Sequence, residues 1–428
     1  MKIVIIGGGP SGFSAAMVAK KVGAEVTVVE RTDMLGGLGL VAGVAMPGSA
    51  ISVFTEEKAL GGADLADIFD AIATHKLIVV PGVGEDVTLY NPARLDSRLQ
   101  KALSKAGVEF MLRKTVVNTE MSNNKINAVI LQDGTRIIGD AFIDATGATE
   151  GPKACNEWGR GCVECILRCP TFGPPGGVVE KKVKTVASLN SYGKPGVTGT
   201  SVLISKASLS PIVEKQLNEN GYAIIPVPSG VTIDEDRMKR AGMPLYFRHD
   251  IHKKNIILVD LGGVAKSLAA GGPMYAGSLR SFTGLEDAFI IQPNAGAIGH
   301  LVSWTTMAYR DNSLKVDGFE NLFCAGHKAG PLVSLLAAIV TGDLAGYNAV
   351  KWSMGQDCLE LPGTLMVGAF IDYVGQQMRS EEGLKRRYGT EEIELLKELK
   401  VYRKNRDEII KEVENVGLKG VYQTKLCG

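Results

Sequence analysis

Residues 2–12 read KIVIIGGGPSG, a short run of apolar, mostly β-branched residues that ends in a glycine-rich turn. The run has the length and composition of a buried strand, and residues 13–22, FSAAMVAKKV, follow it with the apolar spacing of a helix. Residues 25–30, EVTVVE, form a second strand pattern that ends in an acid. Strand, glycine turn, helix, strand and acid stand in the order that predicts a dinucleotide-binding βαβ unit.

The glycine turn matches the pattern G-x-G-x-x-G, and each glycine has a physical task. Gly7 permits the tight turn, Gly9 lets the backbone approach a pyrophosphate, and Gly12 lets helix and strand pack closely. Pro10 and Ser11 complete the motif at the start of the helix, whose free N–H groups and positive dipole end attract phosphate. The turn therefore predicts a site for a dinucleotide.

The acid that ends the second strand is Glu30, which stands 18 residues after Gly12. In this position its carboxylate can accept hydrogen bonds from ribose hydroxyls. Arg31 follows it directly, and a Gly-Gly step, Gly36-Gly37, comes shortly afterwards. The acid and the second glycine turn extend the predicted nucleotide site beyond the first loop.

Composition limits the class of protein. A chain of 428 residues favours two or three domains, and 45% apolar with 22% charged residues is typical of a globular protein. The net charge of +1 gives no global basic field that would recruit nucleic acid or an anionic membrane. Neither a secretory signal nor an apolar run of membrane-spanning length is visible, so we expect a cytoplasmic protein without a membrane partner.

Two later segments accompany the βαβ unit. Residues 138–147, IGDAFIDATG, form a strand pattern that ends in Ala-Thr-Gly. Residues 318–330, GFENLFCAGHKAG, precede an apolar helix. In these segments and in the glycine turns, the chain resembles the FAD-dependent oxidoreductase superfamily with the glutathione-reductase-type nucleotide fold.

The resemblance implies FAD as the cofactor and assigns its contacts to the matching positions. The acid and the glycine turns would meet the ribose, the diphosphate and the ribityl chain, Val116 would meet the adenine, and the late segment would meet the flavin. The implied FAD-binding residues are Gly7, Gly9, Pro10, Ser11, Gly12, Glu30, Arg31, Gly36, Gly37, Val116, Ala145, Thr146, Gly147, Ala325, Gly326 and Leu332.

Within the superfamily the chain is similar to two subgroups. One contains fumarate-reductase-like and heterodisulfide-reductase-like flavoproteins. The other contains flavoproteins that modify tRNA uridines, on the basis of residues 292–311, QPNAGAIGHLVSWTTMAYRD, residues 322–349, and residues 168–178, RCPTFGPPGGV. A second dinucleotide fingerprint is absent from the sequence, which argues against a pyridine-nucleotide disulfide reductase.

The predicted fold class is α/β, with a Rossmann-like FAD-binding domain that carries a β-meander, an inserted antiparallel β-rich substrate domain and a C-terminal helical tail. We expect residues 1–150 and 296–355 to form the two parts of the FAD-binding domain. Residues 151–295 would form the inserted domain, because short strand patterns alternate there with Gly/Pro turns. Residues 356–428 would form the helical region, with an exposed helix pair over 380–414.

Residues 161–170, GCVECILRCP, hold Cys162, Cys165 and Cys169 at C-x2-C-x3-C. The spacing matches the end of a bacterial ferredoxin run, so one interpretation is an iron–sulfur cluster. Its fourth ligand would be Cys155 or one of the distant Cys324, Cys358 and Cys427. A second is thiol chemistry beside the flavin, with Cys162 and Cys165 as catalytic or redox residues. A third is simple packing, and the sequence leaves all three open.

His327 and Lys328 follow Gly326 in the late segment and are the remaining catalytic candidates, because a positive group near the flavin would stabilise its anionic reduced form. We expect an enzyme that moves a hydride or electrons between FAD and a small-molecule substrate. The alternatives are a folate- and FAD-dependent enzyme that modifies RNA uridines, and a non-catalytic electron-transfer subunit. An electron-transfer protein is a candidate partner, the net charge disfavours nucleic acid, and the tail helices favour a homo-oligomer.

Overall fold

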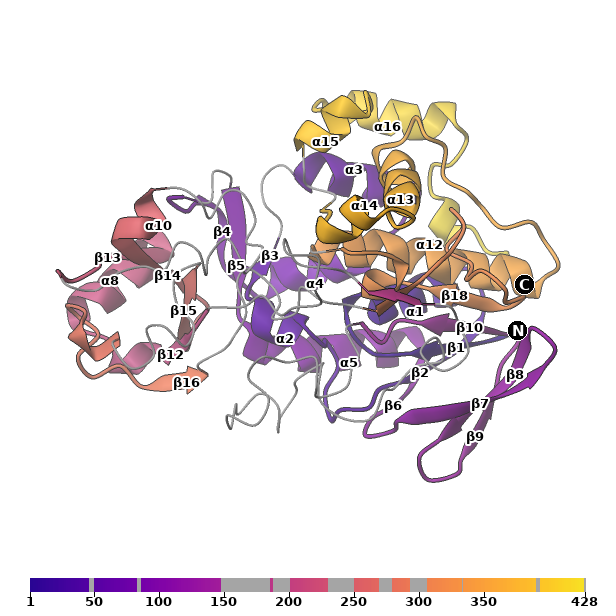
Figure 1. The fold of residues 1–428 in the computed structure, drawn as a ribbon, viewed down its shortest axis with the longest axis horizontal. Coiled ribbons are helices and arrows are strands. Elements are labelled where there is room, and N and C mark those ends of the chain that lie inside the picture. The colour runs from indigo at the N-terminus through magenta and orange to yellow at the C-terminus, as the bar shows by residue number, and fades with distance from the viewer. Residues whose placement is uncertain are drawn as a thin grey trace.

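The computed structural model describes residues 1–45, 50–82, 86–147, 185–187, 201–229, 250–268, 279–292, 306–332, 334–389 and 393–426. These residues form a nucleotide-binding part, an inserted β-rich part at one end of the molecule, and a helical C-terminal region that covers the nucleotide-binding part (Figure 1). The α/β fold class expected from the sequence is confirmed.

A parallel sheet with the strand order β18-β10-β1-β2-β6 forms the centre of the nucleotide-binding part. Its side chains are almost entirely buried, as expected of a sheet covered on both faces. The strand β10 pairs with β18 in the register Asp144 to Cys324, so chain segments on either side of the inserted part meet in one sheet. The strands are β1 (Lys2–Ile6), β2 (Glu25–Val29), β6 (Glu109–Met111), β10 (Ala141–Asp144) and β18 (Leu322–Cys324).

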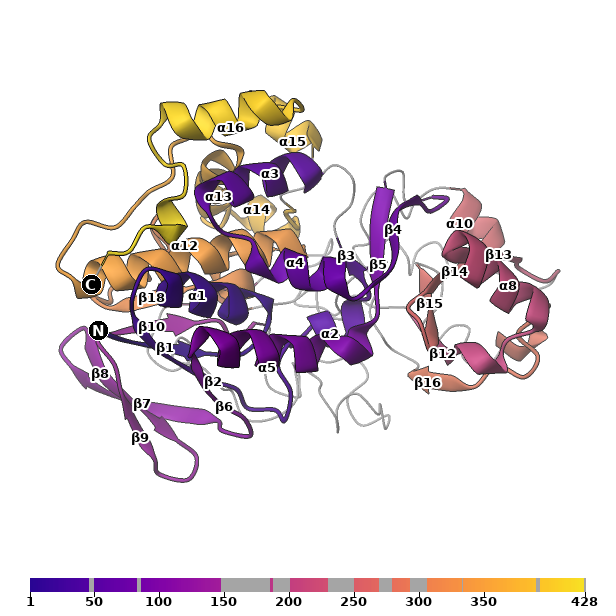
Figure 2. The ribbon, with the colours of Figure 1, turned by 180° about the vertical axis from the view of Figure 1, so that it is seen from behind.

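Helices cover this sheet, and α4 and α5 lie on the face that is seen in Figure 2. A three-stranded antiparallel meander extends from its edge, as predicted. The helices are α1 (Pro10–Lys21), α2 (Gly39–Ala42), α3 (Ala50–Leu60), α4 (Asp64–Ala71), α5 (Leu95–Ala106) and α12 (Leu335–Ser353), and the meander strands are β7 (Val116–Ser122), β8 (Lys125–Leu131) and β9 (Arg136–Ile138).

The helices α1 and α12 pack against each other at two glycines of α12. A Cβ atom on Gly342 would lie 2.4 Å from the Ser11 backbone oxygen, and one on Gly346 would lie 2.3 Å from the Ala15 backbone oxygen. No real Cβ atom comes so close to a backbone oxygen, so only glycine permits this separation of the two helices. The contact fixes α12 against the helix that begins at the first glycine turn.

The inserted part is an antiparallel sheet with the strand order β13-β14-β15-β12-β16. The helix α8 packs on one face, and a small sheet of order β3-β5-β4 packs on the other. The elements are β13 (Tyr222–Pro226), β14 (Asn255–Asp260), β15 (Val264–Leu268), β12 (Leu203–Ser205), β16 (Ile290–Gln292), α8 (Pro211–Asn220), α10 (Ile251–Lys254), β3 (Val44–Ala45), β4 (Ala73–Val79) and β5 (Asp86–Tyr90).

Buried polar contacts join the inserted sheet to the nucleotide-binding part. The Asp260 carboxylate lies 3.0 Å from His75 Nε2 on β4 and 2.8 Å from Lys206 Nζ. Lys266 on β15 is fully buried, and its Nζ donates to the Ala42 carbonyl oxygen at 2.9 Å. Because buried charges require partners, these contacts hold the inserted sheet next to α2.

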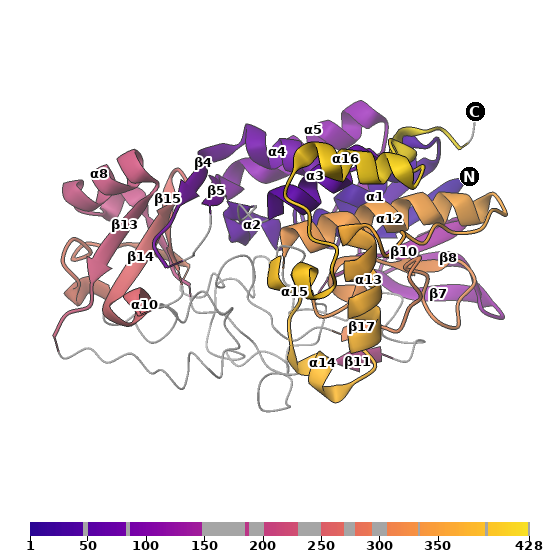
Figure 3. The same cartoon turned by 90° about the horizontal axis from the view of Figure 1, so that it is seen from above.

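The C-terminal region lies over α3 and α12 (Figure 3). The helix pair expected over 380–414 is instead a series of short helices. Asn405 starts a new helix, because its side-chain oxygen accepts hydrogen bonds from the Asp407 and Glu408 N–H groups. The region contains α13 (Met366–Gln377), α14 (Glu381–Lys385), α15 (Ile393–Glu398), α16 (Arg406–Asn415) and the short 3-10 helix η7 (Val421–Gln423).

The remaining regular elements are short. A two-stranded antiparallel pair joins β11 (Thr185–Ala187) and β17 (Thr306–Ala308). The other 3-10 helices are η1 (Pro92–Arg94), η3 (Lys206–Ser208), η5 (Leu279–Ser281) and η6 (Gly326–Ala329). None of the helices in the described ranges has both the length and the apolar character of a membrane span.

Substitution of Gly346 by alanine tests the contact between α1 and α12. We expect Gly346→Ala to lower the free energy of unfolding by about 1–3 kcal/mol, because the added methyl group forces the two backbones apart. Gly363→Ala is the matched control, since Gly363 is exposed and a Cβ there would meet no atom within 4 Å. Urea unfolding measures both, and equal midpoints for the two variants would contradict the packing argument.

Candidate functional site

The first glycine turn leads directly from β1 into α1. Gly7 has φ of +106°, and a Cβ on Gly12 would lie 1.8 Å from the Gly7 carbonyl oxygen, so both positions require glycine. Gly9 caps α1 in an extended conformation with no side-chain hydrogen bond, and the first turn of the helix holds no acid. The amino end of α1 therefore offers uncapped N–H groups, which is the arrangement that binds phosphate.

The second glycine turn lies against the first. Gly36 has φ of +111° and its N–H donates to the Gly8 carbonyl oxygen at 2.8 Å. A Cβ on Gly37 would lie 3.1 Å from the Gly9 Cα atom. The two loops expected to meet the diphosphate are thus neighbours beside the start of α1.

Glu30 lies at the end of β2, with its side chain buried against the first turn. Its carboxylate accepts hydrogen bonds from the Gly8 N–H at 2.8 Å and from the Thr32 N–H and hydroxyl at 2.8 and 2.9 Å. These bonds fix the orientation of the carboxylate, and its two oxygens retain acceptor capacity for a further donor. The expected ribose contact is compatible with this geometry.

The chain that leads to Val116 runs beside the end of β2. The Lys114 N–H donates to the Glu30 carbonyl oxygen at 2.9 Å, and the Arg113 N–H donates to the Thr32 carbonyl oxygen at 2.8 Å. Val116 is the first residue of β7 and is buried. Its position next to the acid agrees with the expected adenine side of the site.

The Ala-Thr-Gly segment contacts the first turn. The Ala145 N–H donates to the Ile6 carbonyl oxygen at 2.9 Å, and a Cβ on Gly7 would lie 2.4 Å from the Ala145 carbonyl oxygen. Asp144 accepts from the Thr146 N–H and hydroxyl at 3.1 and 2.7 Å, and Gly147 has φ of +67°. The turn after β10 is therefore held against the turn after β1.

The late segment reaches the start of α1 from the other side. The Ala325 N–H donates to the Asp144 carbonyl oxygen at 3.0 Å. Gly326 has φ of +63°, its N–H donates to Thr341 Oγ1 at 2.9 Å, and a Cβ there would lie 2.6 Å from Ser11 Oγ. The turns after β1, β10 and β18 consequently meet at the carboxyl ends of three adjacent parallel strands.

The catalytic candidates of the late segment differ in exposure. Lys328 is fully buried, whereas His327 is partly exposed, and both lie in η6. Leu332, three residues after η6, is buried beside Tyr388, with which it forms a β-bridge. The structure thus places one buried cation at the turn expected to face the flavin.

Arg310 holds η6 in place and was not singled out by the sequence. It is buried, and its guanidinium donates to the backbone oxygens of Ala329 at 3.1 Å, Ile371 at 2.9 Å and Asp311 at 3.1 Å. Burial lowers the pKa of Arg310, and the nearby Cys324 and acidic groups oppose that shift. The side chain ties the end of η6 to α13.

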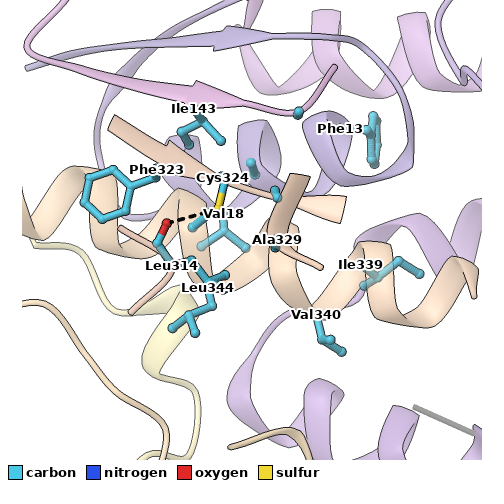
Figure 4. Close-up of a cluster of buried hydrophobic side chains, with 14 of the residues drawn as sticks. Phe13, Val18, Ile143, Leu314, Phe323, Cys324, Ala329, Ile339, Val340 and Leu344 are labelled. Atoms are coloured by element: carbon cyan, nitrogen blue, oxygen red, sulfur yellow. Dashed lines mark hydrogen bonds between the residues drawn. The ribbon is translucent and has the colours of Figure 1, made fainter. Parts of the chain in front are cut away.

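Cys324 is a core residue of β18. Its thiol donates to the Leu314 carbonyl oxygen at 3.6 Å and lies among apolar side chains such as Ile143 and Leu344 (Figure 4). Burial, the largest cause, raises the pKa of Cys324 to about 12. Its thiol is therefore unsuited to nucleophilic chemistry near neutral pH.

The cysteine candidates Cys155, Cys162, Cys165 and Cys169 lie outside the described residues. Within the described ranges, no three His, Cys, Asp or Glu side chains gather as a metal-binding group. The iron–sulfur, thiol and packing interpretations of the cysteine cluster consequently stay hypotheses.

Several basic residues of the tail already have partners. Lys385 pairs with Glu381 and Glu382 at 3.1 and 2.8 Å, and Arg403 lies 3.6 Å from Glu412. The charges of Lys385 and Arg403 are therefore at least in part balanced within the chain.

Comparison with known proteins supports the fold. Residues 2–150 match the family model for FAD dependent oxidoreductases. A search among curated proteins found no match. Among solved structures, the chain is similar to Aquifex aeolicus GidA in its form II crystal, with a TM-score of 0.64 and 15% identity over 97% of this chain and 76% of that chain. The form I crystal gives 0.61 and 16%, over 97% and 78%.

A weaker likeness is to CabE, an aromatic hydroxylase from angucycline biosynthesis, with a TM-score of 0.46 and 13% identity over 90% of this chain and 74% of that chain. At identities of 15 and 16%, the two GidA structures show a shared fold and no more. That fold extends over 97% of this chain.

Replacement of Arg310 tests its hold on η6. We expect Arg310→Met to lower the free energy of unfolding by about 1–3 kcal/mol and to weaken FAD retention, because buried backbone oxygens lose their donors. Arg379→Met is the control, since Arg379 is 59% exposed and pairs only distantly, at 3.5 Å, with Asp317. Urea unfolding and flavin released on dilution measure both effects, and identical behaviour of the two variants would refute the assignment.

Proposed function

We propose that the chain is an FAD-dependent oxidoreductase that moves a hydride or electrons between FAD and a small-molecule substrate, and the match of residues 2–150 to the family model for FAD dependent oxidoreductases supports this proposal. One observation carries the proposal: the turns at 7–12, 145–147 and 325–326 meet at the carboxyl ends of β1, β10 and β18. Ligands of open α/β sheets bind at this edge.

The residues at this edge fit FAD. The uncapped start of α1 and the turn at Gly36 and Gly37 would hold the diphosphate, Glu30 would accept from the ribose, and Val116 would border the adenine. When bound, FAD supplies a ring system that accepts and donates hydride or single electrons. Lys328 supplies a buried positive charge in η6, where it would stabilise negative charge on the cofactor.

A small molecule is favoured over RNA as the substrate. The net charge is +1, and Lys385 and Arg403 of the tail form ion pairs within the chain, which reduces the basic charge that these two residues offer to a polyanion. The RNA-uridine alternative rests on the sequence resemblance at 292–311, 322–349 and 168–178. Most of the first stretch and all of the last lie outside the described residues. The cysteines at 162 and 165 would relay electrons or act as thiols, since they follow the Ala-Thr-Gly segment closely in sequence.

Anaerobic redox experiments test the proposed function. Purified protein should show flavin bands, and its reduced form should be reoxidised without oxygen by one of a panel of quinones, enoates and small disulfides. Measurement of iron and acid-labile sulfide in the same sample distinguishes an iron–sulfur cluster from free thiols, and Cys162→Ala serves as the comparison. Strongly salt-dependent RNA binding without reoxidation by any small molecule would favour the RNA alternative instead.

The proposed ribose contact gives a separate prediction. We expect Glu30→Gln to weaken FAD binding about 10- to 100-fold, because a hydrogen bond to a charged acceptor contributes about 1.5–3 kcal/mol. Glu109→Gln on the neighbouring strand is the control, since the Glu109 side chain is exposed and its carboxylate accepts a hydrogen bond from the Thr27 hydroxyl at 2.9 Å. Flavin fluorescence during titration of the apoprotein gives both affinities, and unchanged binding by E30Q would place the ribose elsewhere.

A further inference from the structure

Buried oxygens without a hydrogen-bond partner gather where α3, α12 and η7 meet. Among the described residues they include Glu57 Oε1 and Oε2, Asp343 Oδ1 and Tyr422 Oη. All three side chains are fully buried. A buried polar atom without a partner is costly, so this concentration requires an explanation.

The two carboxyl groups face each other across Gly62. A Cβ atom on Gly62 would lie 2.3 Å from Asp343 Oδ2 and 2.9 Å from Glu57 Oε1. The groups are close enough to hydrogen-bond to each other. Two ionised carboxylates can only accept, so a bond between them requires a proton on one of them.

The neighbours of the pair indicate which group carries the proton. Asp343 Oδ2 accepts from the Ala63 N–H at 2.7 Å, and this bond stabilises the ionised form of Asp343. Glu57 has no such donor in the described part of the chain. Burial raises the pKa of both groups, and the negative charge of Asp343 raises that of Glu57 further. The proton therefore resides mainly on Glu57.

The other charged groups at this junction are already engaged. Glu56 accepts from the Met366 and Val367 N–H groups at the start of α13, at 3.0 and 2.8 Å, and burial raises its pKa to about 7. Arg403 and Glu412, which form an ion pair, have smaller and opposite effects: Arg403 lowers the pKa of Glu56 and Glu412 raises it.

The groups nearest to Asp343 are likewise paired. Lys21 and Asp64 lie beside it and form an ion pair at 2.6 Å. Tyr347 packs its ring at 5.5 Å from that of Tyr422. None of these groups donates a hydrogen bond to Glu57.

Tyr422 brings the C-terminal segment, residues 416–426, onto this pair. The Gly420 N–H donates to the Ala59 carbonyl oxygen at 2.8 Å, and the Leu426 N–H donates to the Val22 carbonyl oxygen at 3.0 Å. Burial raises the pKa of Tyr422, and the charges of Glu57 and Asp343 raise it further. The segment thus closes the carboxyl pair off from water.

We propose that Glu57 and Asp343 share one buried proton, and that this proton holds the C-terminal segment on α3 and α12. Loss of the proton leaves two adjacent buried carboxylates, and undocking of the segment admits the water that solvates them. The proposal is independent of the substrate and of the redox function.

The direction of the pH effect follows from linkage. Above the ordinary carboxyl pKa of about 4, the docked state holds a proton that the solvated groups have lost. The docked state is therefore favoured fully at low pH, and its advantage is lost as the pH rises through the raised pKa of the pair. Between the ordinary pKa and this raised pKa, the equilibrium constant for opening should rise up to tenfold per pH unit, the slope for one proton, and above the raised pKa it should level off.

Hydrogen exchange of the full-length holoprotein tests the proposal. Exchange of residues 416–426 is followed by mass spectrometry from pH 5 to 10 and corrected for intrinsic rates. In the wild type, the opening constant should rise with pH, whereas Glu57→Gln should abolish the rise, because its amide donates to Asp343 at every pH. Asp67→Asn is the control, since this exposed carboxylate pairs with Lys58 at 2.7 Å, and it should behave as the wild type. A rise that persists in E57Q overturns the proposal.

Infrared spectroscopy of the wild type decides the case even where E57Q fails to fold. At pH 8, above the pKa of about 7 that burial gives Glu56, the carbonyl band of a protonated carboxylic acid should remain and then disappear on further titration. Absence of this band at pH 8, or exchange of residues 416–426 that does not depend on pH in the wild type, overturns the proposal.

Discussion

The amino end of α1 is packed so closely on its neighbours that several segments need glycine there. Gly12 approaches the Gly7 carbonyl, Gly326 approaches Ser11, and Gly342 and Gly346 approach the backbone of α1. These contacts place the turns after β1, β10 and β18 around one helix end, although β18 follows the inserted part in sequence. The proposed phosphate site depends on this packing, because an uncapped helix end offers the free N–H groups that would bind phosphate.

The 3-10 helix η6, which lies next to the start of α1, is held by hydrogen bonds from residues outside the turn itself. The turn after β18 contains two glycines, Gly326 and Gly330. Arg310 donates hydrogen bonds to backbone oxygens of η6 and α13. The Thr341 hydroxyl oxygen accepts a hydrogen bond from the Gly326 N–H. The buried guanidinium is tolerated because three hydrogen bonds to carbonyl oxygens and the nearby carboxylates of Asp311 and Asp372 offset part of its desolvation.

The parts that the sequence predicts correctly are those whose signals are local. The strand, turn, helix and acid of residues 2–30 can be recognised within one βαβ unit, and β14 is a continuous apolar run. The β4–β5 hairpin is missed, because β4 alternates poorly and its packing partner, the inserted sheet, is remote in sequence. Arg310 is missed for a related reason: its partners are backbone oxygens, which leave no trace in the sequence pattern.

Asp343 is visible in the sequence, but its contacts cannot be predicted from it. A single acid in the apolar helix 335–353 is a visible signal, yet its partners, Glu57 and the Ala63 N–H, lie far away in the sequence. Ala63 has φ of +67°, a conformation that costs a non-glycine residue about 1–3 kcal/mol. The bond to Asp343 holds this residue at the start of α4, which gives the buried carboxylate a structural task. Once Asp343 is ionised for that task, Glu57 beside it can be buried only in its protonated form.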